Sequence, residues 1–175
     1  MIIDECGSNL NLTPRYARAP RGQRAFGQVP RNTPPNTTVI ASLTLAGIGP
    51  SVLMPGATDG LAFEAYIEQV LAPALRAGQV VILDNLSVHR SARVAHLIHA
   101  RGCELWFLPS YSPDFSPIEQ AFAKFKQALR RAGARTLALL YDAIANALPN
   151  ISPLDAHGFF LACGYPVPGS RATSL

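Results

Sequence analysis

Apolar and polar positions follow two different periods along the chain, and they predict strands and helices in a definite order. Continuous apolar runs, typical of buried strands, occur at MIID (1–4), VVILD (80–84) and CELWFLP (103–109). Residues 37–46 and 49–54 are rich in Val, Ile, Leu and Thr, and the GIGP sequence between them predicts a hairpin with a Gly-Pro turn. One further short strand is expected at RAFGQV (24–29).

Five segments have apolar residues at helical spacing and are predicted to be helices: residues 59–77, 90–101, 116–132, 136–148 and 153–162. Antiparallel strands therefore come first and strand–helix–strand units follow, which predicts a mixed α/β sheet with helices on both faces. We expect one domain over residues 1–165 and a flexible C-terminal tail over residues 166–175.

Composition narrows the class of protein. Hydrophobic residues make up 49% of the chain and charged residues only 15%, which excludes a disordered tail. The net charge of +4 and the pI of about 9.3 favour an anionic partner, most simply nucleic acid. Three cysteines without a CxxC pair argue against a disulfide scaffold, and no secretory signal is apparent, so we expect a cytoplasmic protein. Association with the nucleoid is an expectation that rests on the family resemblance given below.

Three carboxylates stand at the predicted ends of elements. Asp4 and Asp84 close two strands, where open α/β sheets bind their ligands, and Glu119 lies in the first turn of a helix. Each has a simpler explanation: Glu119 completes a capping box with Ser116, Asp84 is a turn residue, and Asp4 is a polar residue near the start of the chain. Gathered at one edge, however, the three would repel one another, and a hard cation such as Mg²⁺ would relieve that repulsion.

Basic residues offer candidate contacts to nucleic acid. On the helix after Glu119, Lys126 and Arg130 follow the acid at helical spacing, beside an apolar stripe of Ile118, Phe122, Phe125 and Leu129. The loop at 10–36 carries further candidates, namely Arg15, Arg18, Arg21 and Arg24. The alternative for both sets is an ordinary solvated surface. Trp106 and Phe107 lie in an apolar run and are expected in the core.

Several longer segments of the sequence are similar to those of a known protein family. The segments IIDECGSNLNLT, RAPRGQR, LDNLSVHR and LPSYSPDFSPIEQAFAKFK, with the ending ISPLDAHGFFLACGYPVP, resemble the catalytic region of DDE transposases. The closest similarity is to mariner-like enzymes of bacterial insertion sequences. The spacing agrees: 119 − 84 = 35, so 34 residues separate the second and third acids.

The resemblance implies an RNase H-like fold with sheet order 3-2-1-4-5 and a metal-binding triad of Asp4, Asp84 and Glu119. It also implies two Mg²⁺ ions, replaceable by Mn²⁺, that serve DNA cleavage at transposon ends and strand transfer by the freed 3′-hydroxyl. Asn85, His89 and Pro117 match motif positions beside the triad. A homodimer that joins two transposon ends is the expected assembly.

The chain departs from the family pattern at its start. Members of the family carry helix-turn-helix modules ahead of the first acid, whereas this sequence begins three residues before Asp4. End recognition is therefore expected from a separately encoded portion. The alternatives are a truncated, non-catalytic remnant that binds DNA or a full-length transposase, and a host RNase H-like nuclease.

Overall fold

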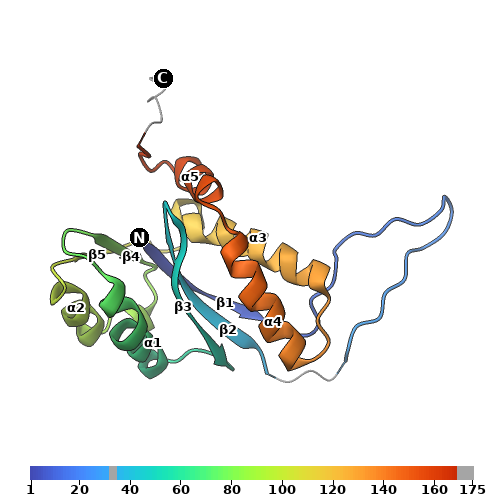
Figure 1. The fold of residues 1–175 in the computed structure, drawn as a ribbon, viewed down its shortest axis with the longest axis horizontal. Helices are drawn as coiled ribbons and strands as arrows, with labels where there is room; N and C mark the ends of the chain where they lie inside the picture. Colours follow the sequence, from blue (N-terminus) through green and yellow to red (C-terminus); the bar gives the residue numbers. More distant parts are fainter. Residues whose placement is uncertain (32–34, 169–175) are drawn as a thin grey trace.

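A single mixed sheet organises the molecule (Figure 1). The computed structural model describes residues 1–31 and 35–168. Its strands, in the spatial order β3-β2-β1-β4-β5, are β1 (Ile2–Ser8), β2 (Thr37–Thr44), β3 (Gly47–Pro55), β4 (Val80–Leu83) and β5 (Glu104–Phe107). β1, β2 and β3 pair antiparallel, whereas β1, β4 and β5 pair parallel. The predicted mixed sheet and its strand order are confirmed.

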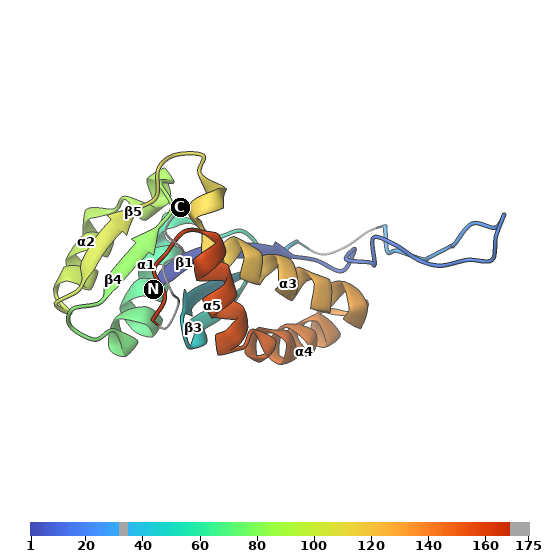
Figure 2. The ribbon, with the colours of Figure 1, turned by 90° about the horizontal axis from the view of Figure 1, so that it is seen from above.

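Helices cover both faces of this sheet, as predicted. α1 (Gly60–Tyr66) continues as a π-helical segment (Ile67–Leu71) and packs with α2 (Ala92–His99) on one face. The other face is covered by α3 (Pro117–Ala132), α4 (Leu137–Ala147) and α5 (Pro153–Ala162). Figure 2 shows these two helical groups on opposite sides of the strands.

Alternation along β1 sends its side chains into two separate cores. Ile2 and Cys6 pack with the α3 side of the sheet, whereas Ile3 packs with the α1 and α2 side. Asp4 shares the parity of Ile2 and therefore faces α3. Glu5 shares the parity of Ile3 and faces the opposite way.

The predicted Gly-Pro turn is wrong. The hairpin turns at Leu45 and Ala46, and the GIGP sequence forms the start of β3. Gly47 has a φ of 104°, which favours glycine, and a Cβ on Gly49 would lie 2.6 Å from the hydroxyl of Ser42. Pro50 is tolerated because β3 is an edge strand, where a missing N–H costs little.

β5 is the other edge of the sheet, and it is not the buried strand that its apolar letters predict. Its residues are largely solvent-accessible: Trp106 is 56% exposed and Phe107 is 39% exposed. The prediction of both aromatics in the core is therefore wrong. A buried strand and an edge strand can share the same sequence pattern, and the exposure seen here follows from the position of β5 at the edge of the sheet.

Residues 13–31, which we call the arginine arm, extend away from the sheet (Figures 1 and 2). No strand forms at 24–29, so that prediction is wrong. The base of the arm is held by Arg135, whose Nη1 donates to the carbonyls of Leu10 (3.1 Å) and Leu12 (3.0 Å). Across the base, the Asn9 amide donates to Asn36 Oδ1 at 3.1 Å.

At the other end of the chain, Val167 is buried against the α3 side, although it lies within the predicted tail. The remainder of that prediction, residues 169–175, lies outside the described residues. Within residues 1–31 and 35–168, no helix has the length and apolar character needed to cross a bilayer.

Candidate active site

The three predicted carboxylates line one cavity. It has a volume of about 320 Å³, and besides Asp4, Asp84 and Glu119 it is lined by Ser116, Asn85, Leu86 and residues 108–113. Asp84 directly follows β4, as predicted. Asp4 does not end its strand, because β1 continues to Ser8. Ile2 pairs with Ile82 in the parallel register, so Asp4 lies level with Asp84, where the neighbouring strand stops.

Glu119 is available to this cavity because it is not a helix cap. Ser116 precedes α3, yet its side chain makes no capping hydrogen bond, so the predicted capping box is wrong. The preceding 3₁₀ turn at Pro113–Phe115 sets the entry into α3, and Pro117 occupies its first turn. The predicted apolar stripe of α3 is confirmed: Ile118, Phe122, Phe125 and Leu129 are all buried. Glu119 therefore keeps its carboxylate at the edge of the sheet.

The electrostatics of Asp4 reflect the gathering of acids. Burial, followed by repulsion from Glu119, Glu5 and Asp84, raises the pKa of Asp4 to about 7, although the Glu5 amide donates to its Oδ1 at 2.7 Å. The carboxyl is thus half-protonated near neutral pH. A charge of opposite sign placed in the cavity would favour its ionised form.

Asp84 has the opposite environment, created by His89. The His89 ring is fully buried and stacks on Phe63 with ring centroids 4.2 Å apart. Its Nδ1 contacts Asp84 Oδ1, and its Nε2 lies 3.1 Å from Glu5 Oε1. Burial opposes the charged forms, but these hydrogen bonds raise the pKa of His89 to about 9 and hold the pKa of Asp84 below its ordinary value.

Asn85 closes the side of the cavity. Its amide donates to Ser110 Oγ at 3.0 Å and its Oδ1 accepts from Arg90 Nε at 2.6 Å. The bond to Ser110 ties the segment after β4 to the segment after β5, and the bond to Arg90 holds the segment after β4 together. Of the motif neighbours expected from the sequence, Asn85 thus holds loops together, while His89 contacts a carboxylate directly.

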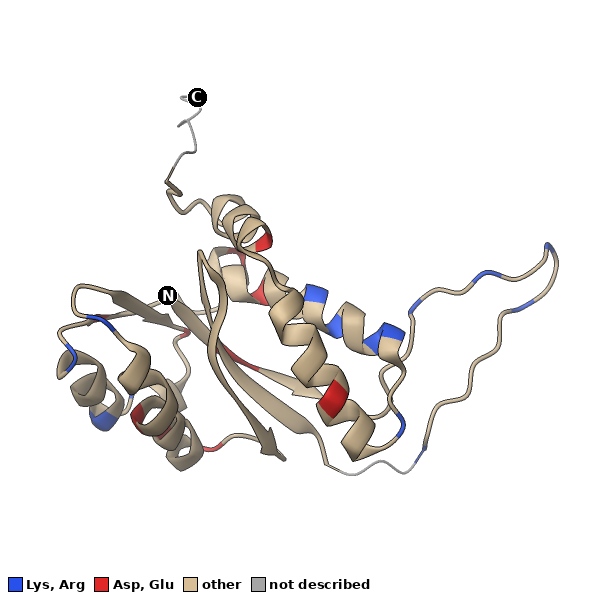
Figure 3. Cartoon of the chain, viewed as in Figure 1, with Lys and Arg blue, Asp and Glu red and all other residues tan. Residues whose placement is uncertain are grey.

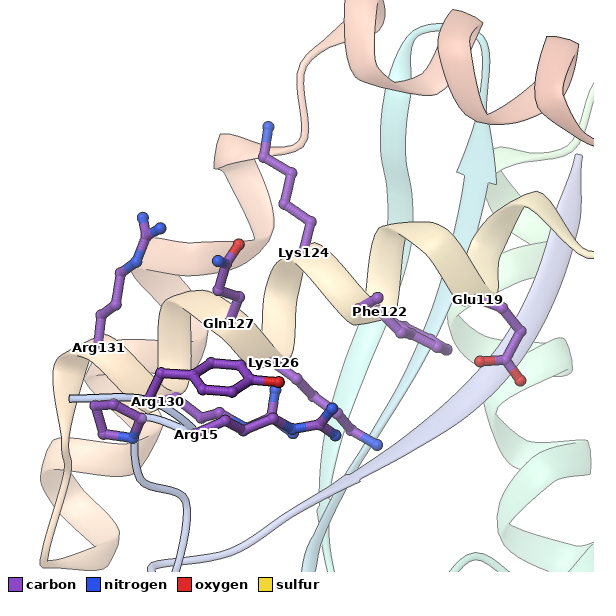
Figure 4. Close-up of a pocket in the computed structure, with 11 residues that line it drawn as sticks. Arg15, Glu119, Phe122, Lys124, Lys126, Gln127, Arg130 and Arg131 are labelled. Carbon is purple, nitrogen blue, oxygen red and sulfur yellow. The ribbon is translucent and has the colours of Figure 1, made fainter. Parts of the chain in front are cut away.

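A second cavity of about 730 Å³ runs along α3 from Glu119. Arg15 at the base of the arginine arm lines it together with Lys126 and Arg130 (Figure 4). Lys124 also lines this cavity, but its amino group points away from Lys126 and pairs with Asp155 at 2.5 Å. Arg18, Arg21 and Arg24 lie farther along the arm and do not line the cavity. In Figure 3 the basic segments of α3 lie in the part of the molecule from which the arm extends.

Comparison with protein families identifies the family to which the chain belongs. The model of the DDE superfamily endonucleases matches residues 1–139, which include all three acids. The chain belongs to this family. No curated protein matches the chain.

Solved structures agree with this DDE assignment at the level of fold. The chain is similar to Mos1 transposase in a paired-end complex with the left transposon end, with TM-score 0.73 and 17% identity, covering 93% of this chain and 50% of that one. The Mos1 strand transfer complex gives TM-score 0.70 and 16% identity, with the same coverage. The Mos1 catalytic domain with Raltegravir and Mg gives 0.61 and 15%, covering 93% and 79%. The fold is RNase H-like, and the chain spans about half the length of the first two proteins.

The donor set suits the divalent metal that this DDE family implies. Three carboxylates on one cavity, one of them with a raised pKa, are the oxygen ligands that Mg²⁺ or Mn²⁺ takes. Among the described residues, however, no three acidic, histidine or cysteine side chains are already close enough to share one ion.

Glu5 is a contributor that was not among the predicted site residues. It does not line the carboxylate cavity, yet it is the second partner of His89. The sequence feature that could have indicated this role is the pair of adjacent acids, Asp4 and Glu5. In a strand, adjacent acids face opposite sides, and a second acid in a buried strand requires a partner of its own.

Proposed function

We propose that this chain is the catalytic domain of a DDE transposase of the mariner-like, insertion-sequence type, and that it cleaves DNA at transposon ends and joins the freed 3′-hydroxyl to target DNA. The observation that carries the proposal is the convergence of Asp4, Asp84 and Glu119 on one cavity within a family of endonucleases. The Mos1 complexes with transposon-end DNA supply further support by fold.

In this proposal Asp4, Asp84 and Glu119 hold two Mg²⁺ or Mn²⁺ ions. When bound, such ions supply Lewis-acid stabilisation of the attacking and leaving oxygens of a phosphodiester. The protein's own part is to present the carboxylates from rigid elements. β1 and β4 fix Asp4 and Asp84 in register, and α3 carries Glu119 across the same edge.

DNA would approach along the second cavity. Lys126 and Arg130 continue from Glu119 along α3, and Arg15 faces them from the arm, so phosphates on one side of the scissile bond would meet three positive charges. Arg18, Arg21 and Arg24 would contact DNA farther out. We further propose that two copies act together on two ends, and that helix-turn-helix modules encoded separately recognise those ends.

Cleavage of duplex DNA by the purified chain in Mg²⁺ or Mn²⁺ tests the proposal. Asp84→Asn keeps the size of the side chain but removes its charge, and we expect cleavage to fall by at least about 10³-fold, since stabilisation of the reacting charge is lost. Asp142→Asn, on the exposed surface of α4, is the matched control and should cleave like the wild type. Equal cleavage by the wild type and Asp84→Asn would refute the assignment.

A further inference from the structure

We propose that Glu5 and His89 are positioning residues that fix the orientation of the Asp84 carboxylate. The inference rests on the proposed function, in which Asp84 is a metal ligand, and it adds to that site two side chains that do not line the carboxylate cavity. Glu5, His89 and Asp84 form a continuous chain across the sheet, from the face of α1 to the carboxylate cavity.

The first step concerns the two oxygens of Asp84. Oδ1 accepts from the Leu86 amide at 3.0 Å and also contacts His89 Nδ1. Among the described residues, both hydrogen bonds of this carboxylate therefore go to the same oxygen. Oδ2 is left for the cavity. Since a metal ligand must present a defined oxygen, the occupation of Oδ1 selects which one that is.

The second step concerns what holds the His89 ring. Phe63 covers one ring face, and the ring itself has no exposed surface. Glu5 Oε1, 3.1 Å from Nε2, fixes the ring edge that points away from Asp84. Each ring nitrogen thus faces a carboxylate oxygen, and the ring cannot turn without breaking a contact on both sides. A ring held at one end only would allow Asp84 to turn.

The third step concerns why Glu5 supplies this contact. Strand alternation sends Asp4 into the carboxylate cavity and Glu5 to the other face, so two adjacent residues of β1 serve the same site from opposite sides. The Glu5 side chain is 18% exposed, hence a partly buried acid whose carboxylate is used by His89. Packing alone would be better served by an apolar side chain at this position.

Two measurements on Glu5→Ala test the proposal. The first is the crystal structure of the metal-free variant, in which we expect the Asp84 carboxylate to turn away from its wild-type orientation. The second is Mn²⁺ affinity by electron paramagnetic resonance, where we expect the dissociation constant to rise about 10- to 100-fold, as for other residues that orient metal ligands. Neither readout requires DNA cleavage.

Two further variants separate positioning from simple loss of structure. Glu5→Gln retains an oxygen that accepts from His89 Nε2 and should recover most of the Mn²⁺ affinity. Glu64→Ala removes an acid that is 21% exposed, faces the same side of the sheet and bonds Ser91 instead. It should bind Mn²⁺ like the wild type.

An unchanged Asp84 orientation in Glu5→Ala would overturn the proposal, whether or not the protein binds metal. Equal losses of affinity in Glu5→Ala, Glu5→Gln and Glu64→Ala would also overturn it, since they would indicate general destabilisation. The proposed function fails in a different way: Mn²⁺ would then bind the wild type and Asp84→Asn equally weakly, with the orientation of Asp84 still depending on Glu5.

Discussion

The carboxylate cavity and the arginine arm both adjoin β1, but the cavity is formed by packed elements and the arm by exposed residues. At the cavity, each acid is carried by a strand or helix with a buried apolar neighbour, and His89 is locked between two carboxylates. On the arm, residues 14–29 are exposed throughout, and within the described residues its arginines make no side-chain hydrogen bond or ion pair.

The difference shows how the two regions are suited to different tasks. Metal-assisted chemistry needs oxygens fixed to a fraction of an ångström, and only packed elements provide that. Contact with a phosphate backbone needs charge within reach but little fixed geometry, since each contact is mainly electrostatic. A rigid cavity flanked by an exposed basic arm therefore suits the proposed cleavage of DNA.

The largest effect is expected at Asp4, whose carboxylate is buried and also faces the other acids. Asp4 has a pKa of about 7 in the folded protein against an ordinary value of 3.8, so the folded state retains a proton that the unfolded state loses. Its contribution to stability is present below about pH 4 and is lost as the pH rises toward 7. Asp4→Asn should therefore stabilise the metal-free protein at pH 8, by at most about 4 kcal/mol.

Thermal unfolding in EDTA across pH 4–8 measures this effect. The wild type should lose stability relative to Asp4→Asn as the pH rises, and added Mn²⁺ should stabilise the wild type but not Asp4→Asn. The control Asp142→Asn, on exposed surface, should follow the wild-type curve. Parallel curves for wild type and Asp4→Asn would show that Asp4 is not strained in the folded state.

The arm should respond in the opposite sense, with a smaller effect that falls on DNA affinity and leaves stability unchanged. Arg18→Gln/Arg24→Gln removes two exposed charges, and the slope of log affinity against log salt should fall in magnitude by about 1–2. Fluorescence anisotropy with a labelled duplex measures the slope, and the unfolding free energy should stay within about 0.5 kcal/mol.

The matched control for the arm is Arg76→Gln/Arg101→Gln, which removes the same charge from exposed positions at the far end of the sheet, near α2 and β5. An equal change in slope for both pairs would mean that only net charge matters. In that case the arm has no particular role in DNA binding, and the proposed division of tasks between the cavity and the arm would be wrong for the arm.

Much of the fold could be predicted from the sequence because its elements are locally determined. The stripe of Ile118, Phe122 and Phe125 can form only a helix with one buried face, and VVIL before Asp84 is a strand buried on both sides. Family spacing joined Asp84 to Glu119. These features depend on residues close in sequence, where periodicity and spacing carry the information.

The features that were not predictable depend on tertiary context. Trp106 and Phe107 have the letters of a core strand, and their exposure follows from the position of β5 at the sheet edge. The Ser116–Glu119 pattern matches a capping box, but the 3₁₀ turn before α3 sets a different entry into the helix. The contact between Glu5 and His89 joins residues 84 positions apart, and no local pattern reports it.

The central claim is that Asp4, Asp84 and Glu119 bind divalent metal at one site. Anomalous diffraction from crystals soaked in Mn²⁺ tests it most directly. We expect a manganese peak about 2.0–2.5 Å from carboxylate oxygens of Asp4 and Asp84, with Glu119 drawn toward it and Asp84 binding through Oδ2. A structure soaked at saturating Mn²⁺ that has no peak in this cavity, or a peak only at other residues, would contradict the account.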